Sequence, residues 1–261
     1  MLDAGWELKE IKSYLGMPVF DQTGLVLHGV TTKIIGDFAA NNQSKESIEK
    51  LSELIGINPE KMVFCNQIHG GDNIYCIQED KIKQNPIPQT DGLITNIHGI
   101  CLMIKVADCV SIFILDSKNK VISLIHAGWR GMMECIVQKA VSKMSAVYNS
   151  KPKDLLVGFG PSIGGCCYKV GPEVISQLKR LASLKFAYGD AYLDEDCLVK
   201  DLIRNGCLDL QQANKKQLIE SGVLEKNIVL NQYCTYHHND LFFSHRRGET
   251  GRMIAFLQLK K

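Results

Sequence analysis

Three residues of this sequence, His69, Cys109 and His126, could together bind a metal ion or carry out nucleophilic catalysis. They occur in the segments NQIHGGD, KVADCVSIFILD and VISLIHAGWRG, each at the expected end of a strand. One thiolate with two imidazoles suits Zn²⁺, and three protein ligands leave a fourth position open for water or substrate. The same residues could instead provide a cysteine nucleophile and its base. Residue type and position leave both interpretations open.

Cationic residues in glycine-containing loops indicate that the site also binds an anion. His126 is followed by AGWRG at a strand-to-helix turn, where backbone N–H groups and a helix N-terminus favour anions. Arg130, in this turn, has a planar guanidinium that can hold phosphate through two hydrogen bonds. Arg246 and Arg247, in SHRRGETG, could bind phosphate in the same way or pair with a surface carboxylate. We therefore predict phosphate binding by Arg130 or by the pair Arg246 and Arg247.

Two acidic residues lie close to these segments. Asp108 directly precedes Cys109 and would point to the opposite face of a regular strand, where it can accept hydrogen bonds at the strand end. We include Asp108 with Arg130 as candidate catalytic residues. Asp91, in TDGLIT, fits a turn residue before Gly92.

Three further motifs carry weaker signals. The neighbouring Cys166 and Cys167 could form a metal pair, but adjacent side chains diverge in an extended chain, which favours a structural role. His237 and His238 lie in a polar loop and are expected to be exposed. The segment GFGPSIGG has glycines near a strand end, yet it matches neither the dinucleotide-binding fingerprint nor the P-loop.

A predicted β-hairpin would bring two of the three candidate ligands together. The apolar runs CVSIFILD and KVISLIHAG flank a short polar turn. If the turn consists of Ser117 and Lys118, Cys109 lies directly opposite His126, with Cβ atoms roughly 5 Å apart on one face. A shift of one residue would separate them. The hairpin therefore supports a shared site without establishing it.

The remaining elements can be predicted from hydrophobic periodicity and turn signals. We expect strands in GLVLHGVTT, GLITN, ICLMIKVAD, DLLVGFGP, NIVLNQYCT and RMIAFLQL. We also expect strands in MVFCNQIHG and NIYCIQ, which lie on either side of a turn at Gly70 and Gly71. We expect helices over residues 44–56 with Ser44 as N-cap, and over residues 132–148, 172–184 and 207–222. Strands and helices alternate without a regular βαβ period, so the fold class is a mixed α/β or α+β domain with helices flanking a mixed sheet. We find no linker or repeat and predict a single domain over residues 1–261.

Composition excludes several classes of partner. The net charge is +2 and lysines are scattered, which gives no electrostatic reason to expect nucleic acid or a membrane surface as a partner. The N-terminus has early acidic residues, and no run reaches the roughly 18 apolar residues of a membrane span, so we expect a cytoplasmic protein. Its ten cysteines should then be reduced. We expect a monomer or a weak homodimer.

The motifs of the chain, taken in order, resemble those of one family. The motifs follow one another in the order QIHG, DGLIT, ADC, HAGWRG, GPSIGGCCYKVG, LDLQQAN, CT and LFFSHRR followed by TGR. This order resembles that of the laccase-domain (YfiH/YlmD-like) proteins. These proteins were once called multicopper polyphenol oxidases and are now regarded as purine nucleoside phosphorylases. The resemblance extends from about residue 26 to the C-terminus. It favours the metal-binding interpretation of the three candidate ligands.

The resemblance implies a cofactor, a fold and an activity. By it, His69, Cys109 and His126 match the family's zinc ligands, and Zn²⁺ is the expected cofactor, with Cu²⁺ as the alternative. The implied fold is a compact α/β domain with a mixed, layered β-sheet, distantly similar to a bacterial cysteine-hydrolase toxin domain. The implied activity is phosphorolysis of adenosine, inosine, guanosine and methylthioadenosine to base and pentose 1-phosphate, with some adenosine deamination. Purine nucleosides and phosphate are then the expected partners.

The chain departs from the family pattern at two places. Where the family usually has an arginine-containing, glycine-rich segment, this chain has TTKIIGDFAANN, and we predict that Lys33 replaces the arginine in substrate binding. Lys169 stands where the family commonly has glutamate. Both differences concern the substrate range rather than the metal.

Three alternative functions remain open from the sequence. A copper-dependent polyphenol oxidase would need several histidine-rich copper centres, whereas this chain has seven histidines and no HxH pattern. A cysteine hydrolase would use Cys109 as nucleophile and His126 as base. A metal-binding regulator without enzymatic activity would use the same three ligands.

Overall fold

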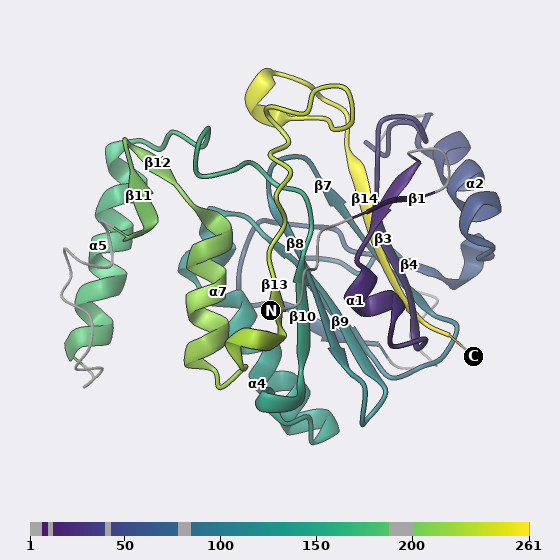
Figure 1. Ribbon diagram of the computed structural model, residues 1–261, viewed down its shortest axis with the longest axis horizontal. Helices are drawn as coiled ribbons and strands as arrows, with labels where there is room; N and C mark the ends of the chain where they lie inside the picture. The colour runs from purple at the N-terminus through teal and green to yellow at the C-terminus, as the bar shows by residue number, and fades with distance from the viewer. Residues whose placement is uncertain (1–6, 10–12, 40–42, 78–84, 188–200, 261) are drawn as a thin grey trace.

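Two six-stranded sheets with helices on their outer faces make up the fold (Figure 1). The computed structural model describes residues 7–9, 13–39, 43–77, 85–187 and 201–260. The first sheet has the order β1 (Glu7–Lys9), β2 (Tyr14–Gly16), β3 (Val26–Thr31), β14 (Met253–Leu259), β7 (Cys101–Val106) and β4 (Met62–Phe64). The second has the order β13 (Ile228–Val229), β10 (Leu156–Phe159), β8 (Val110–Asp116), β9 (Val121–Ala127), β6 (Gly92–Thr95) and β5 (Ile74–Cys76). Each sheet contains parallel and antiparallel pairs, so both are mixed.

Helices and short turns connect these strands. The α-helices are α1 (Pro18–Asp21), α2 (Gln43–Ile55), α3 (Trp129–Met133), α4 (Ile136–Tyr148), α5 (Pro172–Ala187) and α7 (Leu210–Glu220). The 3₁₀ turns are η1 (Pro59–Lys61), η3 (Pro152–Asp154), η4 (Glu225–Asn227) and η5 (His245–Arg247), and a small hairpin is formed by β11 (Ile203–Arg204) and β12 (Cys207–Leu208). None of the described helices is long and apolar enough to cross a lipid bilayer.

The two sheets face each other across a shared core. Successive side chains of a strand point to opposite faces, and β7 shows the consequence. Leu102 and Ile104 pack between the sheets, whereas Cys101 and Met103 pack under α2 on the outer face. In Figure 1, α2 lies on one side of the sheets and α4 with α7 on the other. The order of layers is therefore helix, sheet, sheet, helix.

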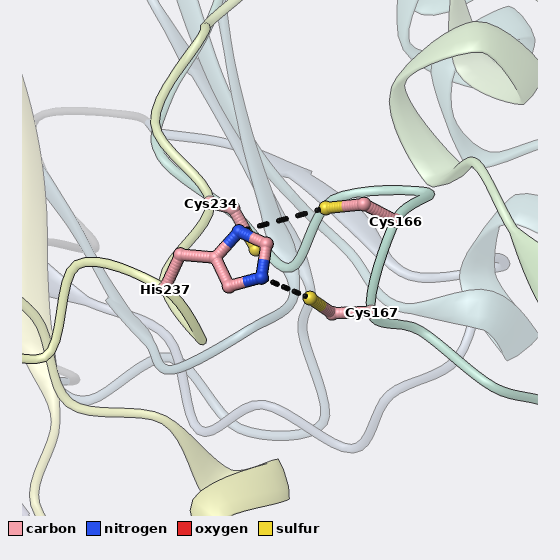
Figure 2. A group of neighbouring side chains, drawn as sticks. All are labelled: Cys166, Cys167, Cys234 and His237. Atoms are coloured by element: carbon pink, nitrogen blue, oxygen red, sulfur yellow. Dashed lines mark hydrogen bonds between the residues drawn. The ribbon is translucent and has the colours of Figure 1, made fainter.

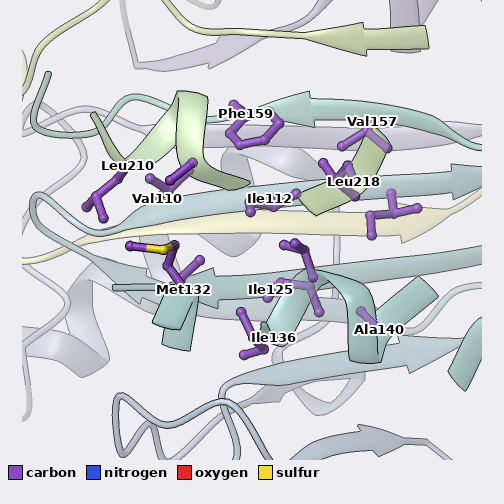
Figure 3. Close-up of a cluster of buried hydrophobic side chains, with 14 of the residues drawn as sticks. Val110, Ile112, Ile125, Met132, Ile136, Ala140, Val157, Phe159, Leu210 and Leu218 are labelled. Carbon is purple, nitrogen blue, oxygen red and sulfur yellow. The ribbon is translucent and has the colours of Figure 1, made fainter. Parts of the chain in front are cut away.

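The second sheet is buried on both faces, which explains its nearly continuous apolar strands. Phe113 and Leu115 of β8 face the first sheet, and Ile112 faces α4 and α7. Figure 3 shows this outer cluster, in which Ile136 and Ala140 of α4 meet the strand side chains. Burial on both faces fixes the positions of β8 and β9, whose ends carry the candidate ligands.

The hairpin of β8 and β9 forms as predicted, but its register was predicted wrongly by two residues. Ser111, not Cys109, lies opposite His126. The turn is longer than predicted because Asp116 pairs with Val121, and the Asp116 carboxylate accepts the N–H groups of residues 118 and 119 inside it. A displacement by an even number keeps every side chain on its face. Cys109 consequently remains a diagonal neighbour of His126.

Several other boundaries differ from the sequence predictions. The predicted helix over 132–148 starts at Trp129 and is interrupted at Cys135, whose left-handed backbone (φ 59°) separates α3 from α4. Helix α2 begins at Gln43, so Ser44 lies within it rather than at its N-cap. The strands on either side of Gly70 and Gly71 belong to different sheets. Residues 1–6, part of the N-terminal segment whose acidic residues were noted in the sequence, lie outside the described residues.

Candidate metal centre and substrate pocket

The structure brings His69, Cys109 and His126 together from two connections between strands and the end of a third strand. His69 lies in the loop between β4 and β5, Cys109 in the turn from β7 to β8, and His126 near the end of β9. One potential ligand atom from each lies within 4.8 Å of the other two, and the two imidazole rings meet edge to face with centroids 4.8 Å apart. The turn containing Cys109 passes from the first sheet to the second, so the three ligands gather where the sheets meet.

Asp91 holds two of these ligands in place. Its Oδ1 accepts the Nδ1–H of His126 at 2.8 Å and the backbone N–H of His69 at 3.0 Å. Its Oδ2 accepts the N–H groups of Ile68 and Gly70, both at 3.1 Å. Because Nδ1 of His126 is occupied, Nε2 is the nitrogen left for a metal, as in carboxylate–histidine–zinc arrangements. Sequence reasoning assigned Asp91 to a turn and missed this function.

The charges at the site favour a thiolate. Burial alone would raise the pKa of Cys109, but attraction to His126 and hydrogen bonds with His126 and His69 outweigh it and lower the pKa to about 6. Burial alone would lower the pKa of His126, but the Cys109 charge and the hydrogen bond to Asp91 raise it to about 9. Cys109 is therefore ready to act as a metal ligand or as a nucleophile at neutral pH.

Gly128 leaves the space into which the Cys109 thiol projects. A Cβ atom at Gly128 would lie 3.0 Å from Cys109 Sγ and 3.7 Å from Cδ2 of His69. The contact with Cys109 would be tight, and the one with His69 would be an ordinary van der Waals contact. The residues present thus fit a zinc ion, since they provide a thiolate, two imidazoles and a backbone without a side chain beside them.

A cavity of about 750 Å³ opens onto the three ligands. Its volume lies within the usual range for small-molecule sites, roughly 300–1,000 Å³. Cationic side chains line it, namely Lys105, Arg130, Arg246 and Arg252, together with His245 and the aromatic side chains of Trp129 and Tyr168. The Arg130 guanidinium lies 4.3 Å from the ring centroid of Trp129, and that of Arg246 lies 4.8 Å from the centroid of Tyr168. Such stacking holds a guanidinium in place while leaving its edge for an anion.

Asp108 lines this cavity and anchors one of its walls. Its Oδ1 accepts the hydroxyl of Thr235 at 2.6 Å, and its Oδ2 accepts the hydroxyl of Ser244 at 3.0 Å and the N–H of Arg246 at 2.7 Å. Its φ of 82° shows that the turn before Cys109 is held in a left-handed conformation. The carboxylate of Asp108 is thus occupied by three donors that fix the position of Arg246.

Two of the residues predicted to bind phosphate or substrate lie outside the cavity lining. Lys33 forms an ion pair with Glu249 at 2.5 Å and a hydrogen bond to the carbonyl of Asn239 at 3.1 Å. Arg247 donates to the carbonyls of Tyr236 and Phe242 and also pairs with Glu249. Arg130 and Arg246 do line the cavity. The structure therefore brings two of the four predicted cations to the metal centre.

Sequence reasoning missed further residues of the cavity. Lys105 is the single cation in the apolar run ICLMIKVAD, and a charge in a buried strand could have indicated its function. Burial lowers the pKa of Lys105. Gln67 fixes the strand beside it, because its side chain exchanges two hydrogen bonds with the backbone of Lys105, at 2.8 and 2.9 Å.

One prediction about cysteines was wrong. Cys166 and Cys167 do not diverge, because residues 164–168 form a tight turn rather than an extended chain. Both thiols lie beside His237 and Cys234, which belong to a turn about seventy residues later. His237 is exposed, as expected.

Comparisons with known proteins place the chain among relatives of similar length. The family model described as "Multi-copper polyphenol oxidoreductase laccase" matches residues 35–260. The purine nucleoside phosphorylase YlmD of Geobacillus stearothermophilus is 34% identical over 217 residues, covering 80% of this chain and 76% of that protein. A purine nucleoside phosphorylase of Bacteroides thetaiotaomicron is 29% identical over 271 residues, covering 96% and 97%.

Solved structures show the same fold. The crystal structure of YlmD from Geobacillus stearothermophilus matches with a TM-score of 0.83 and 27% identity, over 99% of this chain and 100% of that one. The crystal structure of the hypothetical protein YfiH from Bacillus licheniformis matches with a TM-score of 0.81 and 26% identity, over 98% and 99%. The mixed α/β fold predicted from the sequence is thereby confirmed.

Proposed function

This chain belongs to the multi-copper polyphenol oxidoreductase laccase family, and from that premise we propose that it is a zinc-dependent purine nucleoside phosphorylase. Its substrates in this proposal are adenosine, inosine, guanosine and methylthioadenosine, each converted with phosphate to the free base and a pentose 1-phosphate. Deamination of adenosine is a side activity. The observation that carries the proposal is a single cavity in which a three-ligand metal centre faces Arg130 and Arg246.

Phosphorolysis needs a phosphate held beside C1′ of the ribose while the bond to the base breaks. The transition state resembles an oxocarbenium ion, so a fixed anion beside it is stabilising. Arg130 and Arg246 are suited to bind the phosphate, since each guanidinium is already stacked on an aromatic ring. Lys105 adds a third positive charge to the same cavity. The faces of Trp129 and Tyr168 that the arginines leave free offer a surface for the purine.

His69, Cys109 and His126 would hold the zinc ion. When bound there, zinc would supply a Lewis acid and a water of lowered pKa, the chemistry that deamination at the purine C6 requires. Asp91 keeps the His126 ring oriented through Nδ1. We assign Asp108 a positioning role, since its carboxylate is bonded to the loop that carries Arg246.

A cysteine hydrolase is the second candidate, and one observation favours it. Hydrogen bonds connect a possible nucleophile, base and orienting carboxylate, namely Cys109, His126 and Asp91. The pKa of Cys109 is also lowered to about 6. Metal analysis distinguishes the candidates. A purified protein with stoichiometric zinc, in which Cys109 resists alkylation until a chelator is added, supports the phosphorylase.

A copper oxidase has less support in the geometry. Among the described residues, two clusters bring three or more His, Cys, Asp or Glu side chains together, and neither has more than two histidines. Multicopper oxidation of phenols requires several histidine-rich centres, so this arrangement favours the phosphorylase.

The cellular setting is part of the proposal. We place the enzyme in the cytoplasm as a monomer or weak homodimer that acts on small molecules. The net charge of +2 gives no electrostatic reason to expect nucleic acid as a partner, and no disulfide joins the cysteines that the structure describes.

A substrate panel tests this function. The purified protein is incubated with each of the four nucleosides, with and without phosphate, and the products are separated by chromatography. We expect free base and pentose 1-phosphate in equal amounts when phosphate is present, and inosine from adenosine as the minor product. If the panel yields neither a free base nor inosine, the chain is not a nucleoside-cleaving enzyme and a binding role replaces the proposal.

A further inference from the structure

A second cluster of metal-binding side chains lies outside the substrate cavity. It consists of Cys166, Cys167, Cys234 and His237, and Figure 2 shows the three cysteines gathered around the His237 ring. One potential ligand atom from each lies within 4.8 Å of the others. None of the four lines the cavity that contains His69. The cluster is therefore separate from the first metal centre.

Two tight turns create this cluster. The N–H groups of Cys167 and Tyr168 both donate to the carbonyl of Gly164, at 2.9 and 3.1 Å, which folds the two cysteines to one side. The N–H groups of His237 and His238 both donate to the carbonyl of Cys234, at 3.1 and 3.0 Å. Backbone pairing then joins the turns, because the N–H of residue 235 donates to the carbonyl of residue 162 at 3.0 Å. The arrangement is fixed by the backbone.

The side chains already contact one another. Sγ of Cys167 lies 3.1 Å from Nε2 of His237, and Sγ of Cys166 lies 3.9 Å from Nδ1 of the same ring. The N–H of Gly164 donates to Sγ of Cys234 at 3.2 Å, a contact that stabilises a thiolate. A Cβ at Gly164 would come within 3.1 Å of Cys166 Sγ and 3.5 Å of Cys234 Sγ. The backbone therefore leaves room for sulfur atoms to meet.

We propose that Cys166, Cys167, Cys234 and His237 bind a second Zn²⁺ in a closed, four-ligand site. Three thiolates and one imidazole are a ligand set of structural zinc sites, which are tetrahedral and have no open position. With zinc–ligand bonds of roughly 2.0–2.3 Å, ligand atoms in such a site lie roughly 3.5–3.8 Å apart. The ligand atoms, which lie within 4.8 Å of one another, need only small movements: Cys167 Sγ and His237 Nε2 move apart, the more distant atoms move closer, and the His237 ring turns one nitrogen toward the three sulfurs.

This site would stiffen one wall of the substrate cavity. Tyr168 follows Cys167 directly, lines the cavity and lies under Arg246. Thr235, beside Cys234, donates its hydroxyl to Asp108, whose own backbone carbonyl accepts the N–H of Ile163 at 2.9 Å. The second zinc thus joins the turns that hold Asp108, Tyr168 and Arg246. Its chemistry differs from that of the first site, since it offers no position for water or substrate.

Metal content tests the inference independently of any activity. We expect two zinc ions per chain in the wild-type protein, and one in a variant with Cys109→Ser and His126→Ala. A variant with Cys166→Ser and Cys234→Ser should also hold one. Cys207→Ser is the matched control, because Cys207 is buried beside the cluster and contacts the carbonyl of Cys166 without belonging to it; it should retain two.

Cobalt substitution identifies the ligands of the second site even if the Cys166→Ser, Cys234→Ser variant is unstable. In the Cys109→Ser, His126→Ala protein loaded with Co²⁺, we expect the intense thiolate-to-cobalt absorption and the visible bands of a tetrahedral ion. Three results would overturn the inference. They are a Cys109→Ser, His126→Ala variant that contains no zinc, the same variant with copper instead of zinc, and a disulfide between cluster cysteines in the freshly purified wild type. If the wild type and the Cys109→Ser, His126→Ala variant each contain one zinc ion, the result supports the second site and argues against zinc at His69, Cys109 and His126.

Discussion

Asp91 and His126 are joined by two hydrogen bonds where the start of β6 lies beside the end of β9 in the second sheet. The backbone N–H of His126 donates to the carbonyl of Asp91 at 2.7 Å, and the Nδ1–H of its ring donates to Oδ1 of Asp91 at 2.8 Å. The pairing of β6 with β9 places them opposite each other, because Gly92 pairs with Ile125. The sheet register therefore determines the orientation of a metal ligand.

Replacing Asp91 should weaken zinc binding. Asp91→Asn removes the charge that holds the Nδ1–H of His126 and leaves one oxygen for three backbone donors. We expect affinity for zinc to fall by about 10–100-fold, the usual cost of losing a carboxylate partner of a histidine ligand. Competition with a chromophoric chelator measures it. Asp72→Asn is the control, since Asp72 is exposed near the same loop and pairs with Lys139. Equal affinity in both variants would show that Asp91 does not orient the ligand.

A methyl group at Gly128 should disturb the first metal centre. In Gly128→Ala the new Cβ lies 3.0 Å from Cys109 Sγ, so the thiol must move. Overpacking of this kind costs about 1–3 kcal/mol, which corresponds to zinc affinity lower by roughly 5–150-fold. In Gly171→Ala the new Cβ meets nothing within 4 Å, and zinc affinity should be unchanged. If Gly128→Ala and Gly171→Ala bind zinc with equal affinity, Cys109 does not need the space that Gly128 leaves.

The candidate ligands were predictable from the sequence because each lies among small or polar residues at the end of an apolar run. His126 and Cys109 stayed on one face although the register was two residues off, since only an odd displacement would have separated them. The mixed α/β class followed from the alternation of such apolar runs with amphipathic helices. Two facing sheets were not predicted, because a run buried on both faces does not reveal which sheet it joins.

Other parts of the site depend on long-range geometry that local pattern does not contain. Cys234 and His237 meet Cys166 only because two turns face each other, and an extended chain was the wrong assumption for GGCCY. The pairing of Lys33 with Glu249 likewise depends on a contact across 216 positions. From the sequence, Arg247 was paired with Arg246 as a phosphate-binding candidate, and Lys33 was predicted to bind substrate.

Removing single arginines should separate phosphate binding from folding. Arg130→Ala and Arg246→Ala each remove a guanidinium from the cavity, and we expect the KM for phosphate to rise about 10–100-fold, as for a lost charged hydrogen bond of about 1.5–3 kcal/mol. Arg247→Ala should instead lower the melting temperature, since Arg247 donates to backbone carbonyls. Lys118→Ala, in the exposed turn after β8, is the neutral control. An unchanged KM for phosphate in both Arg130→Ala and Arg246→Ala would contradict the assignment of these arginines to phosphate binding.

The reactivity of Cys109 should depend on pH in a characteristic way. Its pKa of about 6 means that the zinc-free protein holds a thiolate above pH 6 and loses it as the pH falls through that value. Alkylation by iodoacetamide should therefore rise between pH 5 and 7 and then level off, as mass spectrometry of the peptide can measure. Cys166, whose pKa is raised by burial, should react only at higher pH. Identical profiles for the two cysteines would contradict the charge pairing with His126.

Restoring activity with zinc tests the central claim most directly. The protein is stripped of metal with a chelator, reloaded with one equivalent or two of zinc, and assayed for conversion of inosine and phosphate to hypoxanthine and ribose 1-phosphate. We predict that stripping abolishes cleavage, that zinc restores it, and that the Cys109→Ser variant stays inactive under both conditions. Cleavage that persists in the stripped protein or in Cys109→Ser, or that proceeds without phosphate, would contradict a zinc-dependent phosphorylase at His69, Cys109 and His126.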